Sequence, residues 1–141
     1  MDTRVSLFFH CTGFEQRPSV NGLPPISVPI ELLNNITPPF LPTTFTFAVG
    51  IGVVGINLEV TNYLKYSFVS PSNKDVVIQE FPLPIAPNDV NLDADMQGFI
   101  LSLNMQNVIL QDEGYYQSKI HLNNTLIGEY SIKVKAVTQN G

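Results

Sequence analysis

Apolar and polar residues alternate along most of this chain with a period of two, which is the pattern of β-strands with one buried face. The alternation is cleanest between residues 115 and 122. The core side of this run consists of Tyr116, Ser118, Ile120 and Leu122, and the opposite side of Tyr115, Gln117, Lys119 and His121. A second run follows, with a core side consisting of Gly128, Tyr130, Ile132, Val134 and Ala136. The two runs predict a β-hairpin.

The hairpin is expected to turn at Asn123 and Asn124, since asparagine tolerates the left-handed backbone conformation better than most residues. A strict two-residue loop would pair Leu122 with Thr125, and would put the apolar faces of the two strands on opposite sides of the sheet. The loop must therefore have an odd length, or a β-bulge must lie near Gly128. We expect the first arrangement, a three-residue loop from Asn123 to Thr125.

Earlier stretches predict the remaining strands. The first strand covers residues 5–12, and its expected core side consists of Val5, Leu7, Phe9 and Cys11. The others cover residues 43–51, followed by a glycine-rich bend, and then residues 57–69, 76–81 and 99–110. Within 57–69 only Asn62 interrupts the alternation. The pattern therefore predicts seven or eight strands and no helix.

Residues 15–42 differ from the rest of the chain, because they contain seven prolines and the turn-forming pair Asn21-Gly22. They predict a long, proline-rich and mostly irregular excursion after the first strand. The segment has room for one short strand from Ile26 to Ile30, or for a helical turn near Glu31 to Leu33. Its apolar residues indicate that it packs against the domain.

The residues that precede the last hairpin indicate the fold class. Asp112, Gly114 and Tyr116 have the spacing Asp-x-Gly-x-Tyr, which in immunoglobulin-like sandwiches begins the penultimate strand. There the tyrosine hydroxyl bonds to the backbone a few residues upstream and forms a corner. Ser118 stands where an antibody domain has its second cysteine, so no disulfide joins the sheets. We therefore predict an all-β fold, an antiparallel immunoglobulin-like β-sandwich, as one domain covering residues 1–141.

Composition narrows the function classes. Charged residues make up 13% of the chain, with a net charge of −5 and only seven Lys and Arg, which are scattered. No basic patch for nucleic acid can be assembled from them. The single Cys excludes a disulfide framework and a cysteine-based metal site. The N-terminus lacks signal-peptide features, and the most apolar run, residues 45–56, is too short to span a membrane. We expect a cytoplasmic protein without nucleic-acid or membrane partners.

Two stretches look like ligand-binding motifs. Gly50-Ile51-Gly52-Val53-Val54-Gly55 has the dinucleotide spacing, but a period-two strand follows it in place of a helix, so we expect a structural bend and no cofactor. The loop of residues 88–95 has oxygen-bearing side chains at alternate positions, but an EF-hand would need Gly and Glu where Ala94 and Ile100 stand. We expect a solvated acidic loop, with calcium held by Asp89, Asp93 and Asp95 as the weaker alternative.

Residues with catalytic side chains do not form a recognisable set. His10 and His121 both fall on the polar faces of their predicted strands, and two histidines without a third ligand make a poor metal site. Cys11 is adjacent to His10 but points to the opposite face, toward the core, as does Ser118. We therefore predict no catalytic residues and no enzymatic activity.

Four stretches of the chain resemble a family of short bacterial and phage-associated immunoglobulin-like β-sandwich proteins. These stretches are VSLFFHCTGF at residues 5–14, Pro38-Pro39-Phe40, SPSNKDVV at residues 70–77, and GYYQSKIHLNNTLIGEYSIKV at residues 114–134. The resemblance covers most of the chain and implies an immunoglobulin-like sandwich. It brings no activity with it.

These observations favour a non-enzymatic module that binds a protein partner or associates with itself. The specific form that we expect is a phage or prophage accessory protein, either structural or an inhibitor of a host system. The alternative is a carbohydrate- or ligand-binding sandwich whose acidic loop holds calcium. The expected partner-binding residues form one exposed sheet face: Tyr63, Lys65, Tyr115, Gln117 and His121. Pairing of edge strands is not expected, because charges on the last strand and prolines in the insert would block it.

Overall fold

A computed structural model describes residues 3–19 and 21–137. Its regular structure consists of nine strands in these ranges and one short 3₁₀ turn, η1, at Ala94–Met96. The strands are β1 (Arg4–Arg17), β2 (Ile26–Leu33), β3 (Asn35–Ile36), β4 (Thr43–Val54), β5 (Tyr63–Val69), β6 (Asp75–Pro82), β7 (Gly98–Leu110), β8 (Gly114–Leu122) and β9 (Thr125–Val134). The predicted all-β class is confirmed. Nine strands are found in place of seven or eight, because residues 15–42 form β2 and β3.

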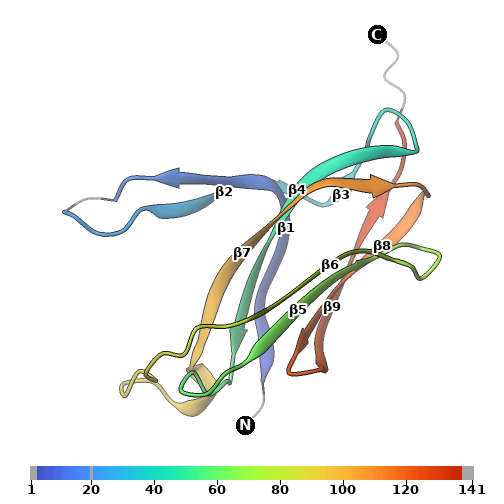
Figure 1. The fold of residues 1–141 in the computed structure, drawn as a ribbon. Coiled ribbons are helices and arrows are strands. Elements are labelled where there is room, and N and C mark those ends of the chain that lie inside the picture. Colours follow the sequence, from blue (N-terminus) through green and yellow to red (C-terminus); the bar gives the residue numbers. More distant parts are fainter. Residues whose placement is uncertain (1–2, 20, 138–141) are drawn as a thin grey trace.

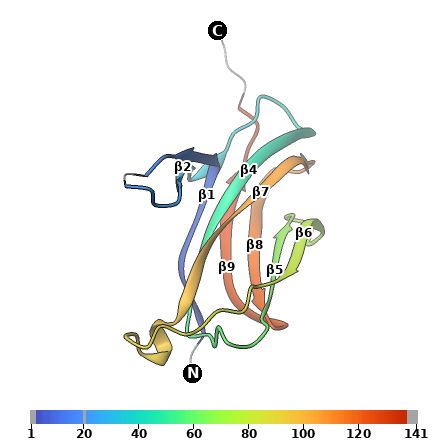
Figure 2. The ribbon, with the colours of Figure 1, turned by 60° about the vertical axis from the view of Figure 1, so that its left-hand side comes forward.

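The strands form two layers, which Figures 1 and 2 show packed face to face. A four-stranded sheet has the order β2-β1-β4-β7, and a five-stranded sheet has the order β3-β9-β8-β5-β6. In an immunoglobulin-like sandwich, strands A, B and E share one sheet, and strands C, F and G share the other. Here β1, β4 and β7 take the first set of positions, and β5, β8 and β9 take the second. The chain therefore has an immunoglobulin-like fold.

One strand position of that fold is empty in the part of the chain that the structure describes. Strand D would pair with β7, but residues 83–97, which link β6 to β7, form no strand. Pro84 and Pro87 lie in this link, and proline cannot donate a hydrogen bond to a sheet. As a result β7 is the last strand of its sheet.

The proline-rich segment is more regular than its composition suggested. β1 continues as far as Arg17, and β2 returns beside it in antiparallel register, with Arg17 facing Ile26 and Gly13 facing Ile30. Figure 1 shows this hairpin projecting sideways from the sandwich. We call residues 13–17 and 26–30 the arm. Pro29 fits in β2 because β2 is an edge strand, where one side of the backbone needs no partner.

The glycine-rich run forms no bend, which corrects the sequence prediction. Gly50 and Gly52 lie inside β4, and the strand ends only at Val54, before Gly55 adopts a positive φ of 79°. A side chain at position 50 would collide with Phe9, since a Cβ there would lie 2.3 Å from the ring. Gly50 therefore lets the Phe9 ring lie directly on the sheet.

Asn62, the residue that interrupts the alternation, marks where β5 really begins. The strand starts at Tyr63 rather than at residue 57, because the Asn62 amide organises a turn before it. Its Nδ2 donates to the carbonyls of Asn57 (2.9 Å) and Val60 (3.1 Å), and its Oδ1 accepts from Asn123 Nδ2 (3.0 Å). The break in the pattern is therefore a structural signal.

The β8–β9 hairpin uses the arrangement that we did not favour. Leu122 pairs with Thr125 across a two-residue loop, in which Asn123 and Asn124 both have positive φ, as a tight hairpin turn requires. The register then shifts, with His121 facing Leu126 but Ile120 facing Gly128. The expected three-residue loop is therefore wrong. A bulge beside Gly128 restores the apolar face, as the alternative interpretation required.

The core lies between the sheets and is rich in aromatic rings. Phe47 of β4 packs on Phe68 of β5 with ring centroids 4.9 Å apart, and Phe68 stacks on Tyr116 at 5.1 Å. The first strand contributes only part of the predicted set, because Val5 packs against the core and Cys11 is buried, but Leu7 and Phe9 lie on the outer face. Phe8 stacks on Tyr130 of the opposite sheet at 4.4 Å, whereas Leu7 is 43% exposed. Both faces of β1 carry apolar side chains, so the period-two pattern could not show which face points into the core.

The tyrosine corner is confirmed. The Tyr116 ring is buried, and its hydroxyl donates to the Asp112 carbonyl (2.9 Å) and accepts from the Asp112 N–H (3.3 Å). Burial raises the pKa of the Tyr116 hydroxyl, and its bonds to the backbone oppose that shift. The corner joins the end of β7 to the start of β8.

We expect Tyr116→Phe to lower the free energy of unfolding by about 1 kcal/mol, since both backbone groups of Asp112 lose their partner. Urea denaturation measures this change. Tyr115→Phe is the matched control, because that side chain is exposed, and it should change little. Equal effects of the two substitutions would contradict the corner.

Candidate functional site

Two neighbouring strands of the four-stranded sheet, β4 and β7, lack charge. Neither the 12 residues of β4 nor the 13 residues of β7 include Asp, Glu, Lys or Arg. The register places six residues next to one another on the outside of β1, β4 and β7: Leu7, Phe9, Gly50, Gly52, Ile100 and Ser102. We call this set the uncharged face. Ile100, on the edge strand β7, is 77% exposed.

The outer face of the five-stranded sheet has the opposite character. Pairs of opposite charge face each other across its strands, Lys65 opposite Glu80 and Lys119 opposite Glu129. Such pairs are typical of a sheet surface in contact with water. The chain thus places charge along the five-stranded sheet and omits it from β4 and β7 of the other sheet.

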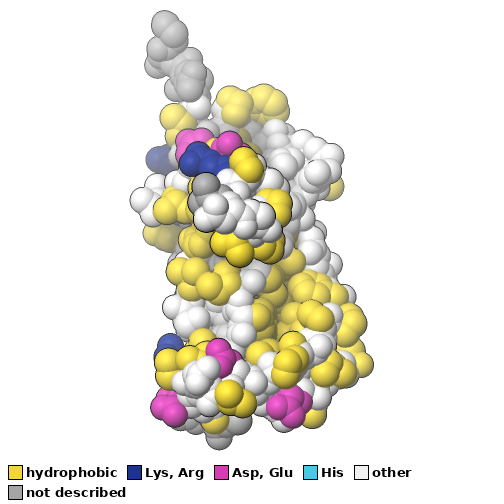
Figure 3. All heavy atoms as spheres, turned by 90° about the vertical axis from the view of Figure 1, so that its left-hand side faces the viewer, with side chains coloured by type: hydrophobic (Ala, Val, Ile, Leu, Met, Phe, Trp, Pro, Cys, Tyr) yellow, Lys and Arg dark blue, Asp and Glu magenta, His cyan; other side chains and the backbone are white. Residues whose placement is uncertain are grey.

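The base of the arm borders the uncharged face, and the two form a recess together. The recess has a volume of about 320 Å³, and its lining includes Phe9, Phe14, Pro29 and Ile100. Figure 3 views the molecule from the side on which the arm projects. Hydrophobic side chains gather through the middle of this view, whereas charged ones lie toward its upper and lower ends. The recess can therefore hold apolar groups, and it offers no charge to recognise an ionic ligand.

The five residues predicted to bind a partner do share one face, on the outside of the five-stranded sheet. β5 and β8 are neighbours, as expected, and Lys65 lies directly opposite His121. The two tyrosines, however, lie at opposite ends of this face. Tyr63 lies beside Asn123, eight positions along β8 from Tyr115, so that about 27 Å separates them. Gln117, between them in the sheet, is half-buried.

Positive charge surrounds the middle of that predicted face. Burial lowers the pKa of His121, and the neighbouring Lys65 and Lys119 lower it further. Lys133 lies over the Tyr115 ring, with Nζ 5.5 Å from the centroid. Whether this face binds a partner stays a prediction.

An amide side chain holds the acidic loop together. Gln97 is buried, its Oε1 accepts from the Asp89 N–H (2.9 Å), and its Nε2 donates to the carbonyls of Asp89 (2.6 Å) and Leu92 (3.0 Å). Asp89, Asp93 and Asp95 are exposed. In residues 3–19 and 21–137 no three His, Cys, Asp or Glu side chains come close enough to hold a metal ion.

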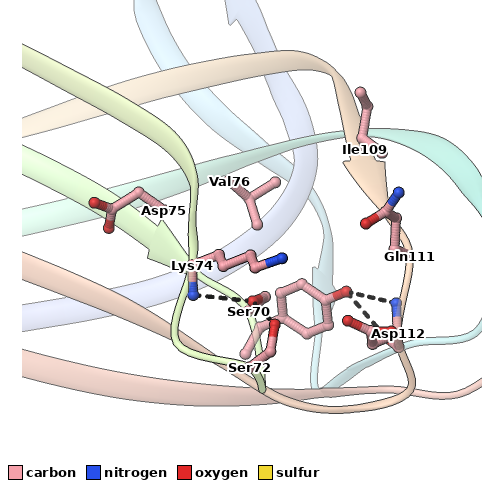
Figure 4. Close-up of a pocket in the computed structure, with 9 residues that line it drawn as sticks. Ser70, Ser72, Lys74, Asp75, Val76, Ile109, Gln111 and Asp112 are labelled. Carbon is pink, nitrogen blue, oxygen red and sulfur yellow. Dashed lines mark hydrogen bonds between the residues drawn. The ribbon is translucent and has the colours of Figure 1, made fainter.

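A second recess lies beside the tyrosine corner, with a volume of about 270 Å³. Figure 4 shows Lys74 extending toward Gln111 while Asp75 points away. The hydroxyls of Ser70 and Ser72 bond to each other at 2.9 Å, and Ser70 also accepts from the Lys74 N–H at 3.1 Å. These groups mainly hold their own turn, so the recess is a weaker candidate than the uncharged face.

A histidine and a serine meet in the core at a distance that would suit catalysis. His10 Nε2 lies 2.8 Å from Ser118 Oγ, which in turn lies 2.7 Å from the Tyr66 hydroxyl. Ser118 and Tyr66 are fully buried and His10 is 6% exposed, so no substrate can reach the serine in this arrangement. The placement of Ser118 is as predicted, but His10 does not lie on a polar outer face. The bond between His10 of β1 and Ser118 of β8 joins the two sheets, and Ser118 stands where an antibody domain has its second cysteine.

Sequence patterning did not identify the uncharged face, because it describes each strand separately. The absence of charge from residues 43–54 and 98–110 was a visible signal. Only the pairing of β4 with β7 shows that both segments form one continuous surface. Cys11 is buried, as predicted. None of the helical segments that the structure describes is long and apolar enough to cross a membrane.

Comparison with known proteins supplies little beyond this geometry. No family model matches the chain. A search of curated proteins found no significant match. Among solved structures, an immunoglobulin-like protein from Pseudomonas aeruginosa is similar, with 12% sequence identity, a TM-score of 0.40, and coverage of 96% of this chain and 98% of that chain. So weak a likeness carries no argument of its own, and the immunoglobulin-like fold rests on the strand order given above.

Proposed function

We propose that this chain is a non-enzymatic protein-interaction module, and that it binds its partner through the uncharged face. The observation that carries the proposal is that the paired strands β4 and β7 contain no charged residue. Interface cores are depleted of charged residues and enriched in aromatic ones, and the uncharged face with its recess has this composition. Phe9 and Phe14 supply the aromatic rings, and Ile100 supplies the most exposed aliphatic side chain.

The arm supports the proposal independently. A two-stranded hairpin is marginally stable in water unless its apolar side chains are covered. Two residues of the arm, Ile26 and Ile30, are 55% and 44% exposed, and Leu23 in the connecting loop is 66% exposed. A partner that contacts the arm and the sheet together would cover these side chains and hold the arm in one position.

The specific form that we propose is a phage or prophage accessory protein, either structural or inhibitory toward a host system. It is supported by the pattern of the opening strand and of the last hairpin, which resemble proteins of that kind. A protein with this role needs a rigid scaffold and one binding surface, and it needs no catalytic residues. The genes that neighbour its own gene would test this assignment directly.

Site-specific photo-crosslinking tests the function in intact source cells. A photoreactive phenylalanine analogue replaces either Phe14, in the recess, or Tyr63, on the opposite sheet. We expect a discrete protein adduct from position 14 and only diffuse labelling from position 63. Diffuse labelling from both positions would refute the interaction module.

The predicted tyrosine face is tested separately by the double variant Tyr63→Glu, Tyr115→Glu. Both side chains are more than half exposed, so the fold should survive the change. We expect this variant to keep the adduct formed from position 14, because its changes lie on the other sheet. Loss of the adduct from a folded double variant would transfer the binding site to the tyrosine face.

A further inference from the structure

We infer that the chain forms a symmetric dimer in which the free edge of β7 pairs, antiparallel, with β7 of a second copy. This inference goes beyond the proposed function, because it concerns the backbone edge of β7 and not the outer surface of the uncharged face. It would join two four-stranded sheets into one sheet and would place the two uncharged faces side by side.

The first argument is that β7, alone among the edge strands that the structure describes, has none of the features that block pairing with another strand. β2 contains Pro29 and has a positive φ of 47° at Glu31. β6 carries Asp75 and Glu80 and ends at Pro82, and β3 is only two residues long. Proteins protect sheet edges by such charges, prolines and short strands. β7 has 13 residues with neither a charge nor a proline.

The second argument comes from the backbone groups of β7. Gln79 Nε2 donates to the Asn104 carbonyl at 3.2 Å, so the backbone of Asn104 faces away from β4. Because the direction alternates along a strand, the N–H and C=O groups of Gly98, Ile100 and Ser102 face the same way. Within residues 3–19 and 21–137 no other strand pairs with this edge. These groups need the backbone of another strand or water.

The third argument favours a second copy over another protein. When a strand pairs with itself across a two-fold axis, every residue faces itself or a symmetry-related neighbour, and like charges in such positions are destabilising. A strand without charge avoids that penalty entirely. With the axis beside Ile100, the two Ile100 residues face each other and Gly98 faces Ser102, each pair exchanging both of its backbone hydrogen bonds.

The axis lies near Ile100 because the free stretch of this edge has a limit at each end. At one end Gln79 already holds the Asn104 carbonyl. At the other end β7 begins only at Gly98. An apolar cleft lies beside the unpaired stretch of β7 from Gly98 to Ser102. It has a volume of about 320 Å³, and its lining includes Phe81, Leu83, Phe99 and Leu101. In the dimer, side chains of the second copy near the axis would cover this apolar surface.

Sedimentation equilibrium of the full chain, compared between variants, tests this dimer. Ile100→Lys places two like charges across the axis, and we expect it to weaken dimerisation by about tenfold or more. Ile78→Lys is the matched control, since Ile78 is 52% exposed on β6, the edge of the other sheet. It should dimerise like the wild-type chain. A monomeric wild-type chain at all concentrations, or equal loss in both variants, would overturn the inference.

A mixing experiment locates the axis. Ile100→Lys and Ile100→Glu should each be mostly monomeric, whereas their equimolar mixture should dimerise, because lysine then faces glutamate. A mixture that stays monomeric would overturn pairing at Ile100. A monomeric wild-type chain that still forms a discrete adduct with another protein from position 14 would leave the proposed function standing while the dimer fails.

Discussion

Ser118→Ala should lower the free energy of unfolding by about 3 kcal/mol, although it removes a single oxygen atom. The Ser118 hydroxyl is the shared partner of two buried groups, His10 Nε2 and the Tyr66 hydroxyl. Removing it leaves both groups without a hydrogen bond in a region that water does not reach. Each unsatisfied buried group costs about 1–3 kcal/mol, and the two costs occur together.

Chemical denaturation of Ser118→Ala and of Ser131→Ala provides the comparison. Ser131 lies on the neighbouring strand β9 and is exposed, so its loss should change the unfolding free energy by less than about 0.5 kcal/mol. If the two variants were equally stable, the hydrogen bonds of Ser118 would contribute nothing to joining the sheets.

Acid should destabilise the protein before its carboxyl groups become protonated, and His10 is the reason. Burial lowers the pKa of His10 from its ordinary value of 6.5 to about 4. Between those two pH values the unfolded chain binds a proton at position 10 and the folded chain does not. The contribution of His10 to the free energy of unfolding is therefore fully present above pH 6.5 and declines as the pH falls toward 4. The expected loss is about 3 kcal/mol, from 1.36 kcal/mol for each pKa unit.

Denaturation midpoints measured from pH 7.5 to pH 4 follow this decline. The chain has two histidines, which supplies a matched pair of variants, His10→Gln and His121→Gln. The pKa of His121 is also lowered, but that side chain is partly exposed, so its share should be small. We expect His121→Gln to keep most of the pH dependence and His10→Gln to lose most of it. The reverse result would show that His121, and not His10, causes the acid sensitivity.

The buried hydrogen bonds also explain how the fold manages without its usual disulfide. A covalent link between the sheets is replaced by an uncharged chain of side chains from β5, β8 and β1. This arrangement depends on a neutral histidine, which is why we expect the stability of this protein to depend on pH. A partner bound to the outer face of the four-stranded sheet would contact the strand that carries His10.

Several errors of the sequence analysis share one cause, which is that alternation specifies a strand but not its neighbours. β1 is apolar on both faces, so Leu7 was expected inside and His10 outside, and the structure places them the other way round. In the last hairpin the choice between a longer loop and a bulge depended on which residues of β9 face the core. Asn62 broke a pattern, and the structure shows that its amide ends the preceding turn.

The sequence by itself determined the fold class, the tyrosine corner at Tyr116 and the inner face of β8, because these follow from period-two patterning and from one local motif. Tertiary structure alone decided three other features: that β4 and β7 form one uncharged surface, that His10 meets Ser118, and that β7 is an unprotected edge. Each of these depends on which strands lie side by side. Partners far apart in the chain, such as His10 and Ser118 at a separation of 108 residues, leave no periodic signal in one sequence.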